Sequence, residues 1–223
     1  MKARQDCERE TEERGQLQDL VMRYPLLREA ETAIWSAFEL LSGCFERGGK
    51  LLIAGNGGSC ADSDHIVGEL MKGFLHNRPL DESRQHQAAQ ALVHYAPDAA
   101  AKLQGALPAI SLTQNTALMT AFANDVDAEL GIAQQVVGYG LPGDVFWGLS
   151  TSGNARNLNI AMRIAKAWGL KTLGLTGAQG GSLREACDVC ICVPEECTPQ
   201  VQELHLPVYH CLCRMLEIRF FGC

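Results

Sequence analysis

His65 and Glu69 are the residues whose types and spacing first point to chemistry. They lie four positions apart, so they share one face if the segment between them is helical. An imidazole and a carboxylate can both move protons, and zinc accepts both as ligands. Two unrelated polar side chains after a tight turn are the alternative interpretation. The pair therefore predicts acid–base catalysis or metal binding on a helix.

A glycine-rich turn precedes this pair, with the sequence Gly-Asn-Gly-Gly-Ser at 55–59. The apolar run 51–54 before it is typical of a buried strand, and a helix is expected to begin near Ser59. Glycines let backbone N–H groups approach an anion, and the positive end of the helix dipole would favour that anion. At about 1.5 Å of rise per residue, the turn lies roughly 10 Å or less from His65 and Glu69. This separation suits a phosphorylated small molecule.

A second polar turn, Ser-Thr-Ser-Gly-Asn at 150–154, follows the apolar run 145–149. Its three hydroxyls and its N–H groups at a helix start are typical of phosphate binding. The lysine of a nucleotide P-loop is absent, because no GxxxxGK[ST] pattern occurs in the chain. A serine-rich helix cap is the alternative for this turn alone. Two such turns at the carboxyl ends of strands in one sheet favour a ligand-binding site.

The charge pattern limits the classes of partner. The 223 residues carry a formal net charge of −7, and no cluster of Lys and Arg stands out, which argues against a nucleic-acid groove. No apolar run is long enough to span a membrane, and the charged N-terminus does not resemble a signal peptide. We therefore expect a cytoplasmic protein whose partner is a small molecule.

The ten cysteines do not form the pattern of a disulfide framework. Cys190 and Cys192 fall in a strand-like run, where free cysteine behaves as a small hydrophobic residue. The spacing Cys187-x-x-Cys190, with Cys197 beyond it, leaves a structural zinc site open, although no second CxxC pair completes it. Cys60, at an expected helix start, is either a reactive thiol or a packing residue.

Strands and helices are expected to alternate along one domain, 1–223. Helices are expected over 5–22 and 26–44 within an N-terminal helical segment, 1–48, and a final helix over 198–220. Strands are expected at 51–54, 108–112, 145–149, 172–175 and 189–193. The alternation predicts an α/β fold with a parallel, doubly wound sheet. An insertion at 75–107, with a helix over 82–95, is expected to be a lid or an assembly surface.

The chain resembles the sugar isomerase (SIS) family, and within it the isomerases of heptose phosphates. The matching stretches are GNGGS at 55–59, His65 and Glu69, Asn124-Asp125, GDVFWGLSTSGN at 143–154, LTG at 175–177, and QELH at 202–205 with His210. The resemblance implies a three-layer α/β/α sandwich with a five-stranded parallel sheet. It also implies a homotetramer with active sites between subunits.

The resemblance further implies a set of site residues. A zinc ion would be held by His65, Glu69, Gln202 and His210. Phosphosugar contacts would come from Asn56, Gly57, Gly58, Glu69, Asn124, Asp125, Ser150, Thr151, Ser152 and Gln202. On an ideal helix Gln202 and His210 lie about 12 Å apart along the axis, so they converge only at full reach, through a kink, or from different subunits. Because Pro207 lies between them, we expect the last helix to bend or to start late.

The implied reaction converts sedoheptulose 7-phosphate to D-glycero-D-manno-heptose 7-phosphate by zinc-assisted proton transfer through an enediolate. We expect Glu69 to act as the base and His210 as the acid. Four positions depart from the family pattern and leave the heptose substrate open: Gly73, Ala155, Pro199 and Gln200. The alternatives are a non-catalytic SIS module that binds a phosphosugar or a protein, of the replication-initiator-associating type, and a phosphosugar-sensing regulator.

Overall fold

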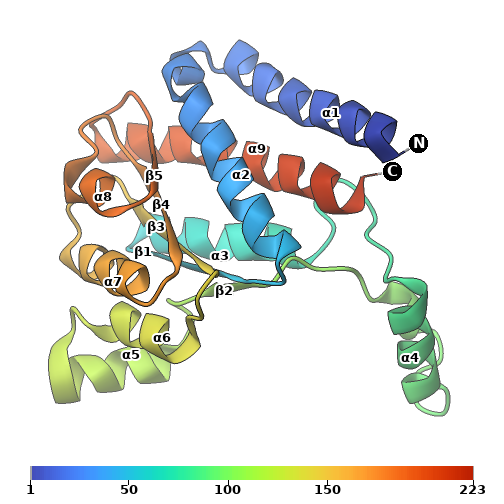
Figure 1. Ribbon diagram of the computed structural model, residues 1–223. Coiled ribbons are helices and arrows are strands. Elements are labelled where there is room, and N and C mark those ends of the chain that lie inside the picture. Colours follow the sequence, from blue (N-terminus) through green and yellow to red (C-terminus); the bar gives the residue numbers. More distant parts are fainter. Residues whose placement is uncertain (1, 223) are drawn as a thin grey trace.

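The computed structural model describes residues 2–222, with side chains from Cys7 onward, and its centre is one parallel sheet (Figure 1). Its strands lie in the order β2-β1-β3-β4-β5 and all neighbours pair in parallel. The bounds are β1 (Leu51–Gly55), β2 (Ala109–Ser111), β3 (Val145–Ser150), β4 (Lys171–Thr176) and β5 (Val189–Cys192). The predicted five-stranded parallel sheet is confirmed.

The helices are α1 (Lys2–Arg23), α2 (Glu31–Glu46), α3 (Gly58–Met71), α4 (Glu82–Leu92), α5 (Thr116–Phe122), α6 (Gly131–Tyr139), α7 (Arg156–Ala167), α8 (Gly181–Ala186) and α9 (Thr198–Phe221). The helices expected over 5–22, 82–95 and 198–220 are present as α1, α4 and α9, and the one expected over 26–44 is divided into a 3-10 helix and α2. Short 3-10 helices lie at Pro25–Ala30 and Ala100–Lys102, and a π-helical turn lies at Ala123–Asp127. Among the described residues, no helix is long and apolar enough to cross a membrane.

Helices cover both faces of the sheet, so the expected three-layer sandwich is present (Figure 1). Alternate strand residues point to opposite faces. Ile53 and Trp147 belong to a core shared with α1, α2, α3 and α9, whereas Leu52 and Phe146 belong to a second core shared with α6, α7 and α8. Strands buried on both faces explain the continuous apolar runs in the sequence.

The last helix lies where it is expected, since α9 begins at Thr198 and runs through Pro207 to Phe221 as one helix. Of the two alternatives drawn from Pro207, a bend or a late start, the late start is excluded. Pro207 is buried. The proline removes one backbone donor, but packing of α9 against α1, α2 and α3 holds the helix together on both sides of it.

The insertion projects from the body of the molecule (Figure 1). Helix α4 has no buried residue, but the chain that leads to it is firmly attached. Arg78 and Glu217 are both buried and form an ion pair of 2.8 Å between Nε and Oε1. Glu217 also accepts hydrogen bonds from the backbone N–H groups of Phe74, Leu75 and His76. The insertion is therefore fixed at its base to helix α9.

Candidate functional site

Glycines shape the turn between β1 and α3. Gly57, directly before α3, has φ of 55°, a left-handed value that other residues rarely adopt. At Gly58 a Cβ atom would collide with the side-chain amide of Gln202. The two glycines therefore serve different purposes: Gly57 turns the chain, and Gly58 lets the Gln202 amide of α9 lie against the turn.

The hydroxyl turn after β3 closes the opposite side of a shared cavity. Gly153 has φ of 68°, and a Cβ there would collide with the Gly180 backbone. The Asn159 side chain donates a hydrogen bond of 3.0 Å to the Gly153 carbonyl, which fixes the turn. Both polar turns line one cavity of about 340 Å³, together with Ala155, Thr198 and Gln202. The residues of the expected set that line it are Asn56, Gly57, Gly58, Ser150, Thr151, Ser152 and Gln202.

A second group of side chains, the histidine cluster of His65, Glu69 and His210, lies further along α3 and α9. His65 Nε2 lies 3.3 Å from Glu69 Oε1 and 3.4 Å from His210 Nε2. The Glu69 side chain is only 13% exposed, and its second oxygen, Oε2, pairs with Lys72 Nζ at 3.0 Å. The cluster therefore joins a carboxylate and two imidazoles, as acid–base chemistry requires.

Tyr209 and Asp62 form a hydrogen-bonded chain to Nδ1 of His65. The Tyr209 hydroxyl lies 3.1 Å from His65 Nδ1 and donates a hydrogen bond of 3.2 Å to Asp62 Oδ1. A hydroxyl has one proton, so when Tyr209 gives it to Asp62, Nδ1 of His65 must be the donor to Tyr209. In a neutral imidazole with this tautomer, the lone pair lies on Nε2, which faces Glu69 and His210.

Burial sets the protonation of these groups. It lowers the pKa of His210, and the neighbouring His65 lowers it further, while Glu69 opposes the shift. Burial raises the pKa of Tyr209, and the negative charge of Asp62 adds to this. His210 is therefore mainly a neutral imidazole near pH 7, with one nitrogen that can donate a proton and one that can accept one.

Helices α3 and α9 connect the cavity to the histidine cluster. Gly58 lies beside Gln202 near the start of both helices, and His65 lies beside His210 further along both. The two helices therefore run side by side in the same direction. From Ser59 to His65 the rise along α3 is about 9 Å, which places an anion pocket and an acid–base cluster at the two ends of one path.

The structure separates Gln202 from the rest of the expected zinc set. Gln202 lines the cavity at the glycine turn, whereas His210 contacts His65. Asn124 and Asp125 are also separate: both are exposed on the π-helical turn, where Asn124 Nδ2 donates a hydrogen bond of 2.8 Å to Asp125 Oδ1. Neither of them lines the cavity at the two polar turns within this chain.

The histidine cluster fits zinc in donor type. Two ligands on one tetrahedral zinc ion, each bonded at about 2.1 Å, lie about 3.4 Å apart. The two separations measured at His65 Nε2, 3.3 and 3.4 Å, match this value. Among the side chains that the structure describes, however, no three His, Cys, Asp or Glu groups are already arranged to hold a metal ion. A small movement of Glu69 or His210 would be needed to close the set.

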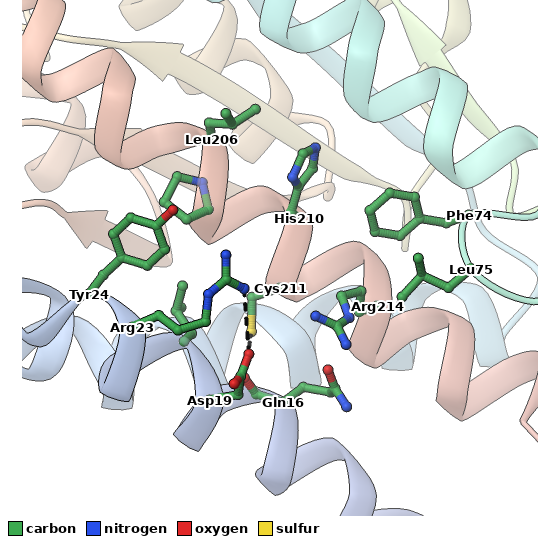
Figure 2. Close-up of a pocket in the computed structure, with 12 residues that line it drawn as sticks. Gln16, Asp19, Arg23, Tyr24, Phe74, Leu75, Leu206, His210, Cys211 and Arg214 are labelled. Carbon is green, nitrogen blue, oxygen red and sulfur yellow. Dashed lines mark hydrogen bonds and ion pairs between the residues drawn. The ribbon is translucent and has the colours of Figure 1, made fainter.

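His210 can also be reached from a second cavity, which the sequence does not indicate. This cavity, of about 290 Å³, lies between α1, α9 and the chain at Phe74 and Leu75. Figure 2 shows His210 and Arg214 of α9 on its wall, with Gln16 of α1 opposite. Sequence reasoning also missed Asp62 and Tyr209. Asp62 could have been found, because it lies three positions before His65 on the same helix face.

No family model matches the chain. The chain is 38% identical to phosphoheptose isomerase 2 of Campylobacter jejuni over 178 residues. This alignment covers 80% of this chain and 76% of that protein. It is 33% identical to the phosphoheptose isomerase of Akkermansia muciniphila over 209 residues, and this alignment covers 94% of this chain and 97% of that protein.

Solved structures of phosphoheptose isomerases also resemble this chain. The phosphoheptose isomerase from Neisseria gonorrhoeae superposes with a TM-score of 0.68 at 27% sequence identity. The match covers 97% of this chain and 99% of that one. The similarity therefore extends over the whole fold, including α1, α2 and the region of the insertion.

Proposed function

The chain belongs to the phosphoheptose isomerase family and is a sugar-phosphate isomerase, and we propose that it converts sedoheptulose 7-phosphate to D-glycero-D-manno-heptose 7-phosphate. One observation carries the proposal: α3 and α9 run in parallel from an anion pocket to an acid–base cluster. An extended seven-carbon sugar has its phosphate at one end and its reacting carbonyl near the other. The separation of about 9 Å along α3 suits such a molecule.

The phosphate is proposed to bind at the two polar turns. Backbone N–H groups at the starts of α3 and α7 and the hydroxyls of Ser150, Thr151 and Ser152 are its donors. Such donors, placed at helix N-termini, bind anions without a basic side chain. The Gln202 amide beside Gly58 is then free to bind a sugar hydroxyl between the phosphate and the reacting carbons.

Glu69 and His210 are proposed to move the protons. Glu69 takes the proton from the hydroxyl-bearing carbon next to the ketone, while His210 donates a proton to the ketone oxygen, which gives an enediol. Glu69 then returns its proton to the former ketone carbon. His210 takes back the hydroxyl proton of the other carbon, which becomes the aldehyde. The low exposure of Glu69 and its place beside His65, which contacts His210, support these roles.

We propose zinc as the cofactor, held by His65, Glu69 and His210. When bound there it would polarise the carbonyl and stabilise the negative charge that develops on its oxygen. Tyr209 and Asp62 would orient His65 so that Nε2 is the ligand atom. Gln202, which the resemblance adds to this set, lies beside Gly58 and is proposed as the fourth ligand as well as a sugar contact, since its long side chain can turn along α9 toward His210.

A homotetramer with sites between subunits is also proposed. Asn124 and Asp125 are exposed and do not line the cavity of their own chain, so a neighbouring subunit is needed to bring them to a site. Co-expression of Glu69→Gln with Asp125→Ala tests this arrangement. Sites shared between subunits should regain measurable activity in the mixed oligomer, whereas sites built within one chain should not.

The proposed function is tested by a direct assay. The purified protein should isomerise sedoheptulose 7-phosphate and act poorly on fructose 6-phosphate, and metal analysis should find about one zinc per chain. Loss of the metal to a chelator should lower turnover, and zinc should restore it. Binding of the heptose phosphate without any turnover, in a zinc-loaded sample, would instead favour the non-catalytic module.

A further inference from the structure

Three cysteine sulfurs meet at the edge of the sheet. Cys190 and Cys192 project from the same face of β5, the last strand of the sheet, because they lie two positions apart. Their Sγ atoms are 3.9 Å apart. Cys187, directly after α8, is the third member. All three side chains are half-buried and reduced, and none of them lines the two cavities described above.

A glycine on the neighbouring strand makes room for this group. Gly174 of β4 pairs with Cys190 in the sheet. A Cβ atom at Gly174 would lie 3.1 Å from both Cys187 Sγ and Cys190 Sγ. That approach is closer than ordinary contact, so a side chain at 174 would push these two sulfurs away. Ile191, between the two strand cysteines, points to the opposite face and into the main core. The sulfurs therefore lie on the face of the sheet opposite the main core, where Cys187 packs against the second core beside Leu183.

The three thiols differ in pKa. A hydrogen bond with Cys190 lowers the pKa of Cys192 to about 7, with burial opposing the shift and the positive charge of Arg184 reinforcing it. The pKa of Cys190 is raised by the same contacts with its two neighbours. The hydrogen bond with Cys190 also lowers the pKa of Cys187. Cys192 and Cys187 are therefore the thiols that more readily become thiolates, the reactive form, and Cys190 stays protonated between them.

We propose that Cys190 and Cys192 are a redox-active pair, which a small-molecule disulfide such as oxidised glutathione converts to an intramolecular disulfide. The Cys192 thiolate attacks one sulfur of the small disulfide, forms a mixed disulfide and releases one thiolate. Cys190 then loses its proton to water, and its thiolate attacks the Cys192 sulfur and releases the second small-molecule thiolate, which takes up a proton. The protein dithiol gives up two electrons, and the small disulfide is reduced to two thiols.

The strand geometry makes this disulfide reversible. Two residues apart on a strand, the Cα atoms are about 6.6 Å from each other, and because the two side chains stand roughly parallel their Cβ atoms lie about as far apart, beyond the roughly 3.5–4.5 Å of a disulfide. The bond therefore forms only when the backbone of β5, an edge strand, bends locally. The strain that this bend stores makes the disulfide easier to reduce. An excess of reduced glutathione should therefore reopen the bond, which suits a thiol pair that responds to the redox state around it.

Mass spectrometry of the full-length protein tests the proposal. The reduced protein is incubated with oxidised glutathione, its remaining thiols are alkylated, and a Glu-specific protease then releases the peptide 186–195, which holds Cys187, Cys190 and Cys192. The expected peptide carries one alkyl group, on Cys187, and its mass is otherwise two hydrogens below that of the reduced peptide. Treatment with reduced glutathione before alkylation should return it to three alkylated cysteines.

Two variants separate the roles of the cysteines. Cys190→Ser should lower the disulfide form of this peptide about tenfold and leave glutathione attached to Cys192, since the attacking thiolate remains but the second thiol is gone. Cys187→Ser is the matched control and should still form the disulfide. A peptide that stays fully alkylated after oxidation, or a disulfide that joins Cys187 to either neighbour in the unmodified protein, would overturn the proposal.

Discussion

The glycine–hydroxyl cavity and the histidine cluster are built in opposite ways. The cavity is made by two short turns, each directly after a strand, and its shape depends on backbone conformation at glycines. The cluster joins side chains that are 145 residues apart and depends on how α3 packs against α9. Binding of the anion is therefore a local property of two loops, whereas proton transfer depends on tertiary packing. Substitutions should be able to damage either region without the other.

The largest effect is expected from Glu69→Gln in the histidine cluster. The change keeps the size of the side chain and removes the base, so kcat should fall about 10³-fold. The dissociation constant of the phosphosugar should change little, because the cavity is untouched. Steady-state kinetics and calorimetry measure the two quantities. Glu203→Gln, an exposed change on α9, is the control; loss of ligand binding in Glu69→Gln would show that the two regions are not separable.

The segment of α9 between the two regions should make stability depend on pH. His205 is fully buried, and burial lowers its pKa to about 4 from the ordinary 6.5, with the Thr176 backbone opposing the shift. As the pH falls, His205 takes up a proton near pH 6.5 in the unfolded chain but only near pH 4 in the folded one. The free energy of unfolding therefore has its full value above pH 6.5 and decreases as the pH drops toward 4. This group alone should remove about 3 kcal/mol over that range.

Urea unfolding at pH 7 and at pH 4.5 measures this loss. A His205→Gln variant is expected to lose less stability between the two pH values than the unmodified protein, although it starts from a lower value at pH 7. An equal loss in both proteins would show that other groups carry the pH dependence.

Gly58→Ala should damage the cavity and spare the cluster. The new methyl group would displace the Gln202 amide, which is the movable end of a long side chain, so the fold should tolerate the change. With Gln202 displaced, KM should rise about tenfold, the cost of roughly one hydrogen bond, while kcat stays within a few-fold. Gly68→Ala on the same helix, where a Cβ meets nothing within 4 Å, is the matched control. A large fall in kcat in Gly58→Ala would place Gln202 in the chemical step.

The smallest effect is expected from Tyr209→Phe. This change removes the hydroxyl that links Asp62 to His65 and leaves the ring in place. His65 should then turn more freely, and zinc affinity should fall about tenfold, with a smaller loss in kcat at saturating zinc. Competition with a fluorescent chelator measures the affinity. Unchanged affinity would show that packing alone, and not the hydrogen bond, orients His65.

The sequence predicts the meeting of the two polar turns better than the contacts between helices, for a physical reason. Apolar runs locate the strands, and the carboxyl ends of parallel strands share one edge, so the two polar turns had to meet. The position of Gln202 depends on which face of α9 meets α3, and periodicity in a helix with Pro207 does not reveal it. The contact of Tyr209 with Asp62 spans 147 residues, and that of Arg78 with Glu217 spans 139. No local pattern encodes such pairs.

The buried pair of Arg78 and Glu217 has a practical consequence for work on this protein. It fixes the base of the insertion, and the bridge between Pro79 and Gln104 joins the two chains that lead to and from α4. Beyond that base, α4 buries no residue, and Tyr95 is 90% exposed. An affinity tag or a fluorophore placed at residues 93–98 should therefore leave the sheet and both site regions intact. The end of the insertion therefore offers an attachment point that projects away from the sheet (Figure 1).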